Sequence, residues 1–396
     1  MRPHFIKIYA LSLIIASAVF PIIGHSETIV PSWISSDQVW TKEKSPYVIR
    51  ENVSFGEGVS LTILSGAKVV FEEPHTVELV SSSLRISGTR EQPVEINKGG
   101  FTLKNTDKSN SVEISFSKME EVFLYWENEP APGSIFIENS SLGGVRCVSH
   151  EECNINDFLI LSSRVKDIDF YQGFSGKGFK IEDGTFGEFS HRQGQMTMRN
   201  SKFKSMRLTP STPSLAQLKM SETTFSTLIF DANKVALVRS RGELVEGSVP
   251  KLGLIEISDS MLETANIDGG TVLKHNSIKT LSIVAKRGPG AQYTVERNNI
   301  SRLNLGFSEG RLKIVNNNIV PRQDIFDFSV RTGCSGAVSI PMMGNYWGPR
   351  ATQRMEWLGP DQNIDEFWDQ RDSSPNNCII NYSDWLPDQV IDAGPR

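Results

Sequence analysis

The sequence predicts an all-β protein with the architecture of a right-handed parallel β-helix, a solenoid with coils of about 20 residues and a tryptophan-rich C-terminal cap. Three observations support this fold class. Short apolar runs with alternating side chains recur at a nearly constant spacing, helical periodicity is almost absent, and Asn, Ser, Asp and Gly separate the runs.

Each repeating unit is marked by an apolar anchor whose first and third side chains we expect to point inward. Between Ile137 and Ile314 the anchor recurs nine times, a mean spacing of about 20 residues. The anchors are Ile135-Phe-Ile137, Leu159-Ile-Leu161, Phe179-Lys-Ile181, Met196-Thr-Met198, Leu218-Lys-Met220, Ala236-Leu-Val238, Ile255-Glu-Ile257, Thr271-Val-Leu273, Tyr293-Thr-Val295 and Leu312-Lys-Ile314. A turn-forming residue and two further apolar positions follow each anchor, so one unit is predicted to be strand, turn, strand, turn, strand. Stacked units bury a continuous apolar ladder that no single unit can bury, and right-handed coiling is the expected hand of parallel crossovers.

The two ends of the repeat region carry further motifs. Leu61-Thr-Ile63 and Leu84-Arg-Ile86-Ser-Gly88 are glycine-punctuated strands, and Asn316-Asn-Asn-Ile-Val320 leads to Gly344-Asn-Tyr-Trp-Gly348. These features resemble the opening coils and the closing rung of secreted proteins of the pectin-lyase-like right-handed β-helix superfamily, over residues 46–350. The resemblance implies the fold and export from the cell. The enzymes of that superfamily act on acidic polysaccharides.

The N-terminus predicts an exported protein. Arg2 and Lys7 precede an apolar run from Ile8 to Ile23, and small residues follow it, which is the pattern of a cleaved signal peptide over residues 1–26. An uncleaved anchor is the alternative, but the run is short for a membrane span. We therefore expect a periplasmic or extracellular protein with a lead-in at 27–45, a β-helix at 46–333, a cap and tail at 334–396, and no membrane span after cleavage.

The charge of the chain argues against nucleic acid as a partner. The leader holds two of the 41 basic residues and none of the 46 acidic ones, so its removal changes the net charge from −5 to −7. A protein of this charge lacks the general electrostatic attraction that nucleic acids require.

Four cysteines indicate disulfides in an exported chain. Cys147 and Cys153 would close a short loop and Cys334 and Cys378 a long one, although four cysteines allow three pairings. Neither pair has Cys-x-x-Cys spacing, so the sequence predicts no metal site and no cofactor.

The composition changes from Trp347 onward, with four Trp and five Pro residues among the last fifty. An open solenoid end exposes strand edges and core, so this region is predicted to be a cap. The alternative is an aromatic platform on which sugar rings stack, formed by Tyr346, Trp347 and Trp357.

No catalytic constellation is recognisable. Asn105-Thr106-Asp107 and Arg311-Leu312-Lys313 match two of the four motifs of the polygalacturonase branch, but they lie about ten coils apart, nearly 50 Å along the axis. Asp167, Asp169, Lys166 and Tyr171 offer the groups of a lyase site, but we expect them to form a solvated turn instead.

A column of outward residues is the strongest candidate binding site. The residue after each anchor should point outward, and in successive coils it is Glu138, Ser162, Glu182, Arg199, Ser221, Arg239, Ser258, Lys274 and Glu296. Arg199, Arg239 and Lys274 would then lie on alternate coils about 10 Å apart, with Lys219 nearby. Acidic glycans carry negative charge at a similar interval, and Arg binds carboxylates bidentately. An ordinary charged solvent face is the alternative.

Three functions follow from these patterns. The first is a non-catalytic exported protein that binds glycan, for example an acidic polysaccharide, or cell-envelope material along a solenoid face. The second is a divergent polysaccharide lyase, epimerase or hydrolase, and the third is a structural or adhesive spacer. Clustered carboxylates on adjacent coils would favour the enzyme, and a polar or basic strip would favour the binder.

Overall fold

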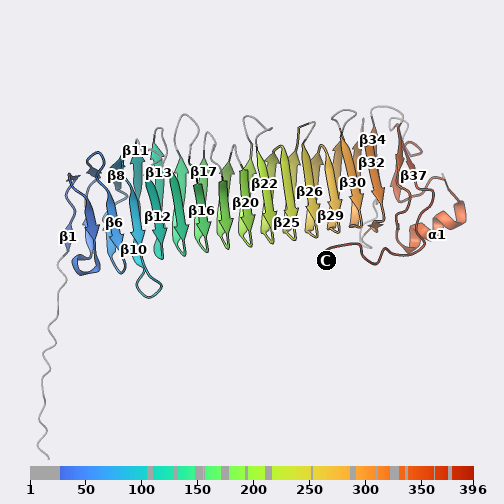
Figure 1. Cartoon of the computed structure of the whole chain (residues 1–396). Helices are drawn as coiled ribbons and strands as arrows, with labels where there is room; N and C mark the ends of the chain where they lie inside the picture. Colours follow the sequence, from blue (N-terminus) through green and yellow to red (C-terminus); the bar gives the residue numbers. More distant parts are fainter. Residues whose placement is uncertain are drawn as a thin grey trace, which may run out of the picture.

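The computed structural model confirms a parallel β-helix (Figure 1). It describes residues 27–396 except for the segments 105–109, 128–132, 148–154, 156, 171–177, 192–194, 210–215, 251–252, 286–290, 308–310, 322–329, 335–337, 361 and 373–376. The predicted signal peptide and Cys153 therefore lie outside the described residues. No helix among the described residues is long and apolar enough to cross a membrane.

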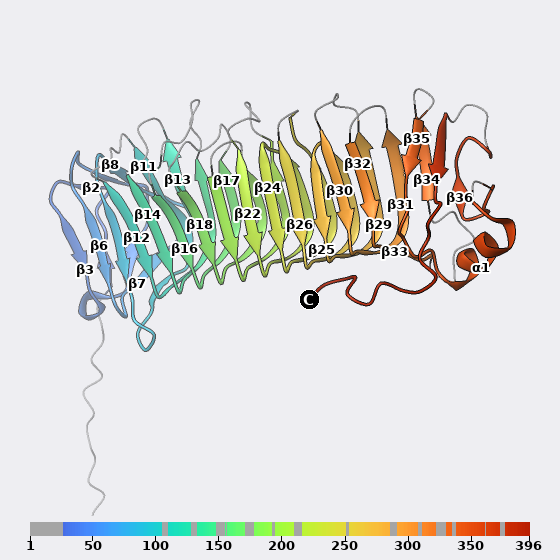
Figure 2. The same ribbon diagram turned by 45° about the vertical axis from the view of Figure 1, so that its right-hand side comes forward.

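The coils stack in chain order along a rod and form two long parallel sheets (Figure 2). Sheet B has 14 strands: β3 (Gln38–Trp40), β6 (Leu61–Leu64), β9 (Leu84–Ser87), β12 (Ser111–Ser115), β14 (Ser134–Glu138), β16 (Asp157–Leu161), β18 (Gly178–Glu182), β20 (Gln195–Arg199), β22 (Gln217–Ser221), β24 (Lys234–Val238), β26 (Leu254–Ser258), β28 (Thr271–Lys274), β30 (Gln292–Glu296) and β32 (Arg311–Val315).

Sheet A has 21 strands and forms the rest of each coil. They are β1 (Thr28–Ile29), β2 (Trp33–Ile34), β4 (Tyr47–Ile49), β5 (Val53–Phe55), β7 (Lys68–Phe71), β8 (Thr76–Val80), β10 (Val94–Ile96), β11 (Lys98–Lys104), β13 (Ser117–Glu127), β15 (Ser141–Cys147), β17 (Arg164–Phe170), β19 (Thr185–His191), β21 (Lys202–Leu208), β23 (Thr224–Asp231), β25 (Arg241–Ser248), β27 (Met261–Asp268), β29 (Ser277–Ala285), β31 (Asn299–Phe307), β33 (Asn318–Ile319), β34 (Val330–Cys334) and β36 (Phe367–Trp368).

The number of strands per coil changes along the rod. The first coils have three short strands, such as β4, β5 and β6, as the sequence predicts. Strand β13 pairs with both β10 and β11, and from there each coil has one bent strand of sheet A in place of two. The bend is regular: in β15, Leu142 pairs with Val165 and Gly144 pairs with Asp167, so the residue between them is left out of the ladder in each strand.

One sharp turn connects sheet B to sheet A in every coil from β14 onward. Its first residue has a positive φ, for example 48° at Asn139 and 54° at Asp183. The next residue is Gly184 after Asp183, and in the other coils it is a small polar residue that is buried under the coil. With the equivalent residues of the coil before β14 and of the cap, these polar residues are Ser117, Ser140, Ser163, Ser201, Thr223, Ser240, Ser260, Asn276, Asn298, Asn317 and Asn345. Ser140 Oγ, for example, accepts from the Ser117 N–H at 3.1 Å and donates to the Glu138 carbonyl at 2.7 Å. This polar ladder replaces the backbone hydrogen bonds that the turn interrupts.

The core is the predicted ladder of inward apolar side chains, with a shift of one residue in two coils. In β16 the buried residues are Phe158 and Ile160, whereas the sequence analysis expected Leu159 and Leu161. In β24, Val235 and Leu237 are buried in place of Ala236 and Val238. Aromatic rings stack between coils, for example Phe158 on Phe179 with 4.4 Å between ring centroids.

The boundary at the N-terminal end differs from the expected one. The segment 27–45, expected to be a lead-in, already contains β1, β2 and β3, which pair with β4, β5 and β6 and form a first coil; the short 3₁₀ helix η1 (Lys42–Lys44) precedes β4.

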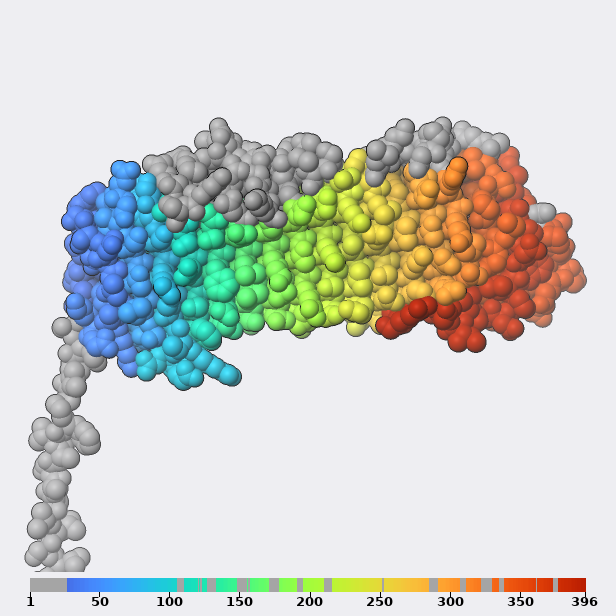
Figure 3. Space-filling model, in the orientation of Figure 1, coloured from blue at the N-terminus to red at the C-terminus, as the bar shows by residue number. Residues whose placement is uncertain are grey.

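The C-terminal end is a cap, as predicted. Helix α1 (Pro349–Leu358) and the pair of β35 (Val338–Pro341) with β37 (Cys378–Asn381) cover the last coil. The Cys334–Cys378 disulfide ties β37 to β34. Beyond the cap, the C-terminal tail (386–396) runs back along the rod, drawn dark red beneath the yellow and orange coils in Figure 3.

Candidate functional site

The predicted column on sheet B does not contain all of its expected members. Arg199 and Lys274 lie in one column, because the strand partners run Arg199, Ser221, Val238, Ser258, Lys274. Arg239 lies one residue further on, at the turn, with a φ of 47°. The one-residue shift in β24 is the cause, since it places Val238 where Arg239 was expected. Lys219 lies in a different column, between Thr197 and Ala236.

The cations of this region are also neutralised. Arg239 lies 2.7 Å from a carboxylate oxygen of Glu222, and Arg199 lies 4.0 Å from the other oxygen. Lys274 lies 3.9 Å from Glu296. Such pairs leave little net charge for an acidic ligand.

The three aromatic residues proposed as a platform do not lie on one surface. Trp347 is buried in the cap and its ring meets that of Phe367 edge-on at 4.7 Å. Tyr346 is half-buried and bridges to Asn318 at the last coil, while Trp357 lies on α1 with 84% of its surface exposed. Cap packing therefore explains Trp347, and the platform is wrong as a joint site.

A different column, at the start of the sheet A strands, has the charge pattern that the sequence analysis sought on sheet B. Seven successive strands from β13 to β25 place in register Lys118, Ser141, Arg164, Thr185, Lys202, Thr224 and Arg241. Cations thus alternate with hydroxyl side chains from coil to coil. The two middle strands with a cation carry a second one at the bend, Lys166 in β17 and Lys204 in β21. We call Lys118, Arg164, Lys166, Lys202, Lys204 and Arg241 the basic ridge.

The side chains of the ridge are exposed and largely unpaired. All six residues are classed as exposed, because their positions point away from the core. Among the residues that the structure describes, only Lys118 has an acidic partner, Glu95 at 3.9 Å. The ridge is therefore a local concentration of positive charge on a chain with a net charge of −5.

The coils between the cations carry short side chains at these positions, and at one position packing excludes a side chain altogether. At the bend of β19, between Lys166 and Lys204, lies Gly187, where a Cβ atom would come 2.6 Å from the Lys166 carbonyl oxygen. Ser141, Thr185 and Thr224 are short. A ligand lying along the ridge would meet cations and hydroxyl groups in turn.

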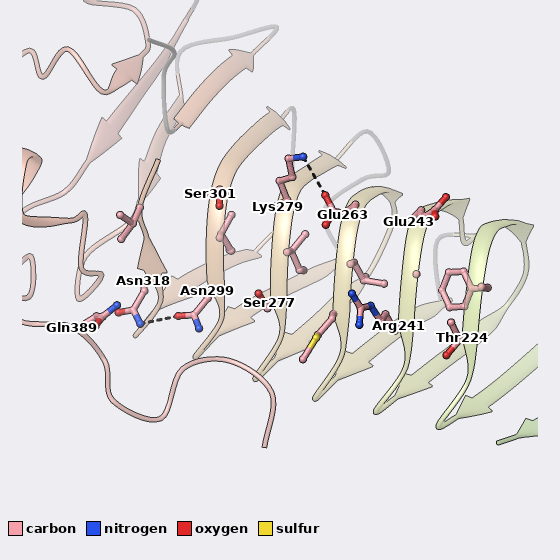
Figure 4. Close-up of a pocket in the computed structure, with 17 residues that line it drawn as sticks. Thr224, Arg241, Glu243, Glu263, Ser277, Lys279, Asn299, Ser301, Asn318 and Gln389 are labelled. Atoms are coloured by element: carbon pink, nitrogen blue, oxygen red, sulfur yellow. Dashed lines mark hydrogen bonds and ion pairs between the residues drawn. The ribbon is translucent and has the colours of Figure 1, made fainter. Parts of the chain in front are cut away.

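The ridge ends in a groove of about 480 Å³ (Figure 4). Thr224 lies at one end of it, next to Arg241, and Asn318 and Gln389 lie at the other end; Lys279 pairs with Glu263 on the adjacent strand at 3.2 Å. Ser277, Asn299 and Asn318 continue the column that carries the ridge.

The C-terminal tail covers the far end of this column. Asn318 binds both polar groups of Val390: its Nδ2 donates to the carbonyl at 3.0 Å and its Oδ1 accepts from the N–H at 2.8 Å. Asn299 Nδ2 donates to the Ala393 carbonyl at 3.2 Å, and the Gly394 N–H donates to the Arg297 carbonyl at 3.0 Å. Two side chains of this column, Asn299 and Asn318, thus hold the backbone of the tail.

The groups considered for catalysis are dispersed or paired. Asp167 and Asp169 point outward from β17, Asp167 lies 4.0 Å from Arg146, and Lys166 belongs to the ridge. Tyr171 and the segment Asn105-Thr106-Asp107 lie outside the described residues, and Arg311 and Lys313 lie in β32. No group of three metal-ligating side chains that could bind a metal ion is found in the part of the chain that the structure describes.

The cysteines of the described residues form disulfides. Cys334 and Cys378 are bonded, with 5.4 Å between their Cα atoms, as one of the predicted pairings has it. Cys147 is also disulfide-bonded, and its expected partner Cys153 lies outside the described residues.

The sequence contains a signal for the ridge that the sequence analysis missed. Each cation that starts a strand follows a buried ladder serine: Ser117-Lys118, Ser163-Arg164, Ser201-Lys202 and Ser240-Arg241. The anchors identify outward positions on sheet B only. These dipeptides follow the turn into sheet A, so the spacing of the anchors does not reveal their column.

Comparisons with known proteins add no further evidence, because no family model, curated protein or solved structure matches the chain. The geometry of the coils and the charges of the ridge are therefore the features that indicate a function.

Proposed function

We propose that this is an exported, non-catalytic protein that binds an acidic polysaccharide along the basic ridge. The observation that carries the proposal is the alternation of exposed cations with hydroxyl side chains over seven coils, on a protein that is acidic as a whole; of these cations only Lys118 pairs with an acid among the described residues. A linear polysaccharide repeats its acidic groups along the chain, and the ridge repeats its cations along the rod, so the two can bind side by side. The resemblance to the pectin-lyase-like superfamily points to the same class of ligand.

Export is supported by the leader and by the cysteine chemistry. Disulfides persist in oxidising compartments such as the periplasm and the cell exterior. Three of the four cysteines lie in disulfides within the described part of the chain.

The binding energy would come from charge-assisted contacts. Arg164 and Arg241 can each bind a carboxylate or sulfate bidentately, and the ridge lysines add point charges. Because these side chains are exposed, each contact contributes modestly and is screened by salt. Affinity therefore arises from the number of contacts along the polymer.

The test compares two triple variants. Replacing Arg164, Lys202 and Arg241 with Gln removes three charges from the ridge. Each exposed contact contributes up to about 1 kcal/mol. With about 0.5 kcal/mol for each of the three contacts, we expect about tenfold weaker binding to sulfated or uronate polysaccharides in calorimetric titrations.

The matched control replaces Arg199, Lys219 and Lys274 with Gln. It removes the same charge from sheet B, where two of the three cations are already paired. We expect less than about a twofold change. An equal loss of affinity in both triple variants, or no loss in the ridge variant, would contradict the proposal.

A second candidate function, cleavage of the same polymer, is favoured by one observation. Asp167 and Glu188 are register partners on adjacent strands, and glycoside hydrolases use a pair of neighbouring carboxyl groups. However, Glu188 is exposed, whereas a catalytic acid has to be shielded from water. Release of oligosaccharides from any bound polysaccharide, abolished by Glu188→Gln, would establish this function instead.

A further inference from the structure

The cations of the basic ridge repeat every second coil. Lys118, Arg164, Lys202 and Arg241 lie on β13, β17, β21 and β25, and the strands between them present Ser141, Thr185 and Thr224. Adjacent parallel strands are about 4.8 Å apart, so the cations recur at intervals of about 10 Å.

The additional ridge lysines, Lys166 and Lys204, do not lie on the strands between those that carry the first cations. Lys166 and Lys204 belong to β17 and β21, the strands that already carry Arg164 and Lys202. They double the charge of those coils and leave the alternation unchanged. On β19 the corresponding position is Gly187, which close backbone contact keeps free of a side chain.

One sugar unit of an extended polysaccharide has about the length of one coil. A homopolymer of uronic acids would therefore place a carboxylate opposite every coil, and every second one would face a hydroxyl side chain. A polymer in which acidic and neutral sugars alternate would place its charges opposite the cations only. Its neutral sugars would face Ser and Thr hydroxyls, which donate to and accept from sugar hydroxyl and amide groups.

We infer that the ligand is a polysaccharide with an acidic group on every second sugar. This inference depends on the proposed function and narrows its ligand to one class of charge repeat. Non-specific attraction makes the opposite prediction, because a polymer with an acid on every sugar has twice the charge density.

The experiment compares two polymers of equal length with the unmodified protein. Hyaluronan carries a carboxylate on every second sugar, and polygalacturonate carries one on every sugar. At equal ionic strength we expect hyaluronan to bind at least about threefold more tightly. Tighter or equal binding of polygalacturonate would overturn the inference while leaving the proposed function intact, and no binding of either polymer would overturn both.

A variant provides the second arm. Thr185→Lys places a cation on an intermediate coil, next to exposed solvent and without a change in the core. It should improve binding of polygalacturonate more than binding of hyaluronan, whereas the control Thr185→Gln should change neither. Equal improvement for both polymers would show that only total charge matters, and would contradict the inference.

Discussion

At the scale of single residues, the polar ladder under the turns determines where each coil folds back. Asn298 is fully buried, and its Nδ2 donates to the carbonyl groups of Leu273 and Glu296, each at 3.0 Å. Its Oδ1 accepts from the Asn276 N–H at 2.9 Å. One side chain thus satisfies backbone groups of two coils, and removing it leaves buried polar groups without partners.

This ladder leads to a prediction for stability. Asn298→Leu keeps the size of the side chain but removes its hydrogen bonds, so we expect a loss of about 2–4 kcal/mol in the free energy of unfolding, measured with denaturant. Asn266→Ala, an outward position of β27, is the control and should change the stability by less than about 0.5 kcal/mol. Similar losses in both variants would show that the ladder has no special role.

Residue-level register is also where sequence reasoning failed. The run Asp157-Phe-Leu-Ile-Leu161 is apolar at four successive positions, so alternation cannot determine which side chains point inward. The turn determines the register, and in the β24 coil its positive-φ residue is Arg239, a residue type that rarely adopts this conformation. A one-residue error there was enough to assign Arg239 to the wrong column.

At the scale of elements, the C-terminal tail shows how the column at the start of the sheet A strands binds a peptide segment. The tail makes backbone hydrogen bonds to Asn318, Asn299 and Arg297, and Asp392 pairs with Arg297 at 2.9 Å. The sequence predicted a cap for this region but gave no indication that the chain returns along the rod, because the contacts join residues more than 70 positions apart.

Asn318→Ala removes both hydrogen bonds to Val390, so it should loosen the whole tail. We expect hydrogen exchange at the Gly394 amide, which donates to Arg297 one coil away, to become faster by at least about fivefold. Exchange in β27 and β29 should stay unchanged. Unaltered protection of Gly394 would mean that the tail is attached independently at each coil.

At the scale of the whole molecule, the repeat length predicted the solenoid, and the apolar pattern predicted most of its core. The site was less predictable, because a column of side chains exists only once the register of every coil is known. The expected pattern of alternating cations and small polar residues does occur in the structure. It lies at the start of sheet A, where the turn ladder places it, and the cations expected on sheet B are largely paired with Glu222 and Glu296.

The central claim is that an acidic polysaccharide lies along the basic ridge, and lysine acetylation measured by mass spectrometry with and without the polymer tests it most directly. Bound polymer should slow the modification of Lys166, Lys202 and Lys204, and leave Lys219 and Lys274 on sheet B unaffected. Protection of Lys219 and Lys274, or uniform protection of all five lysines, would contradict the account.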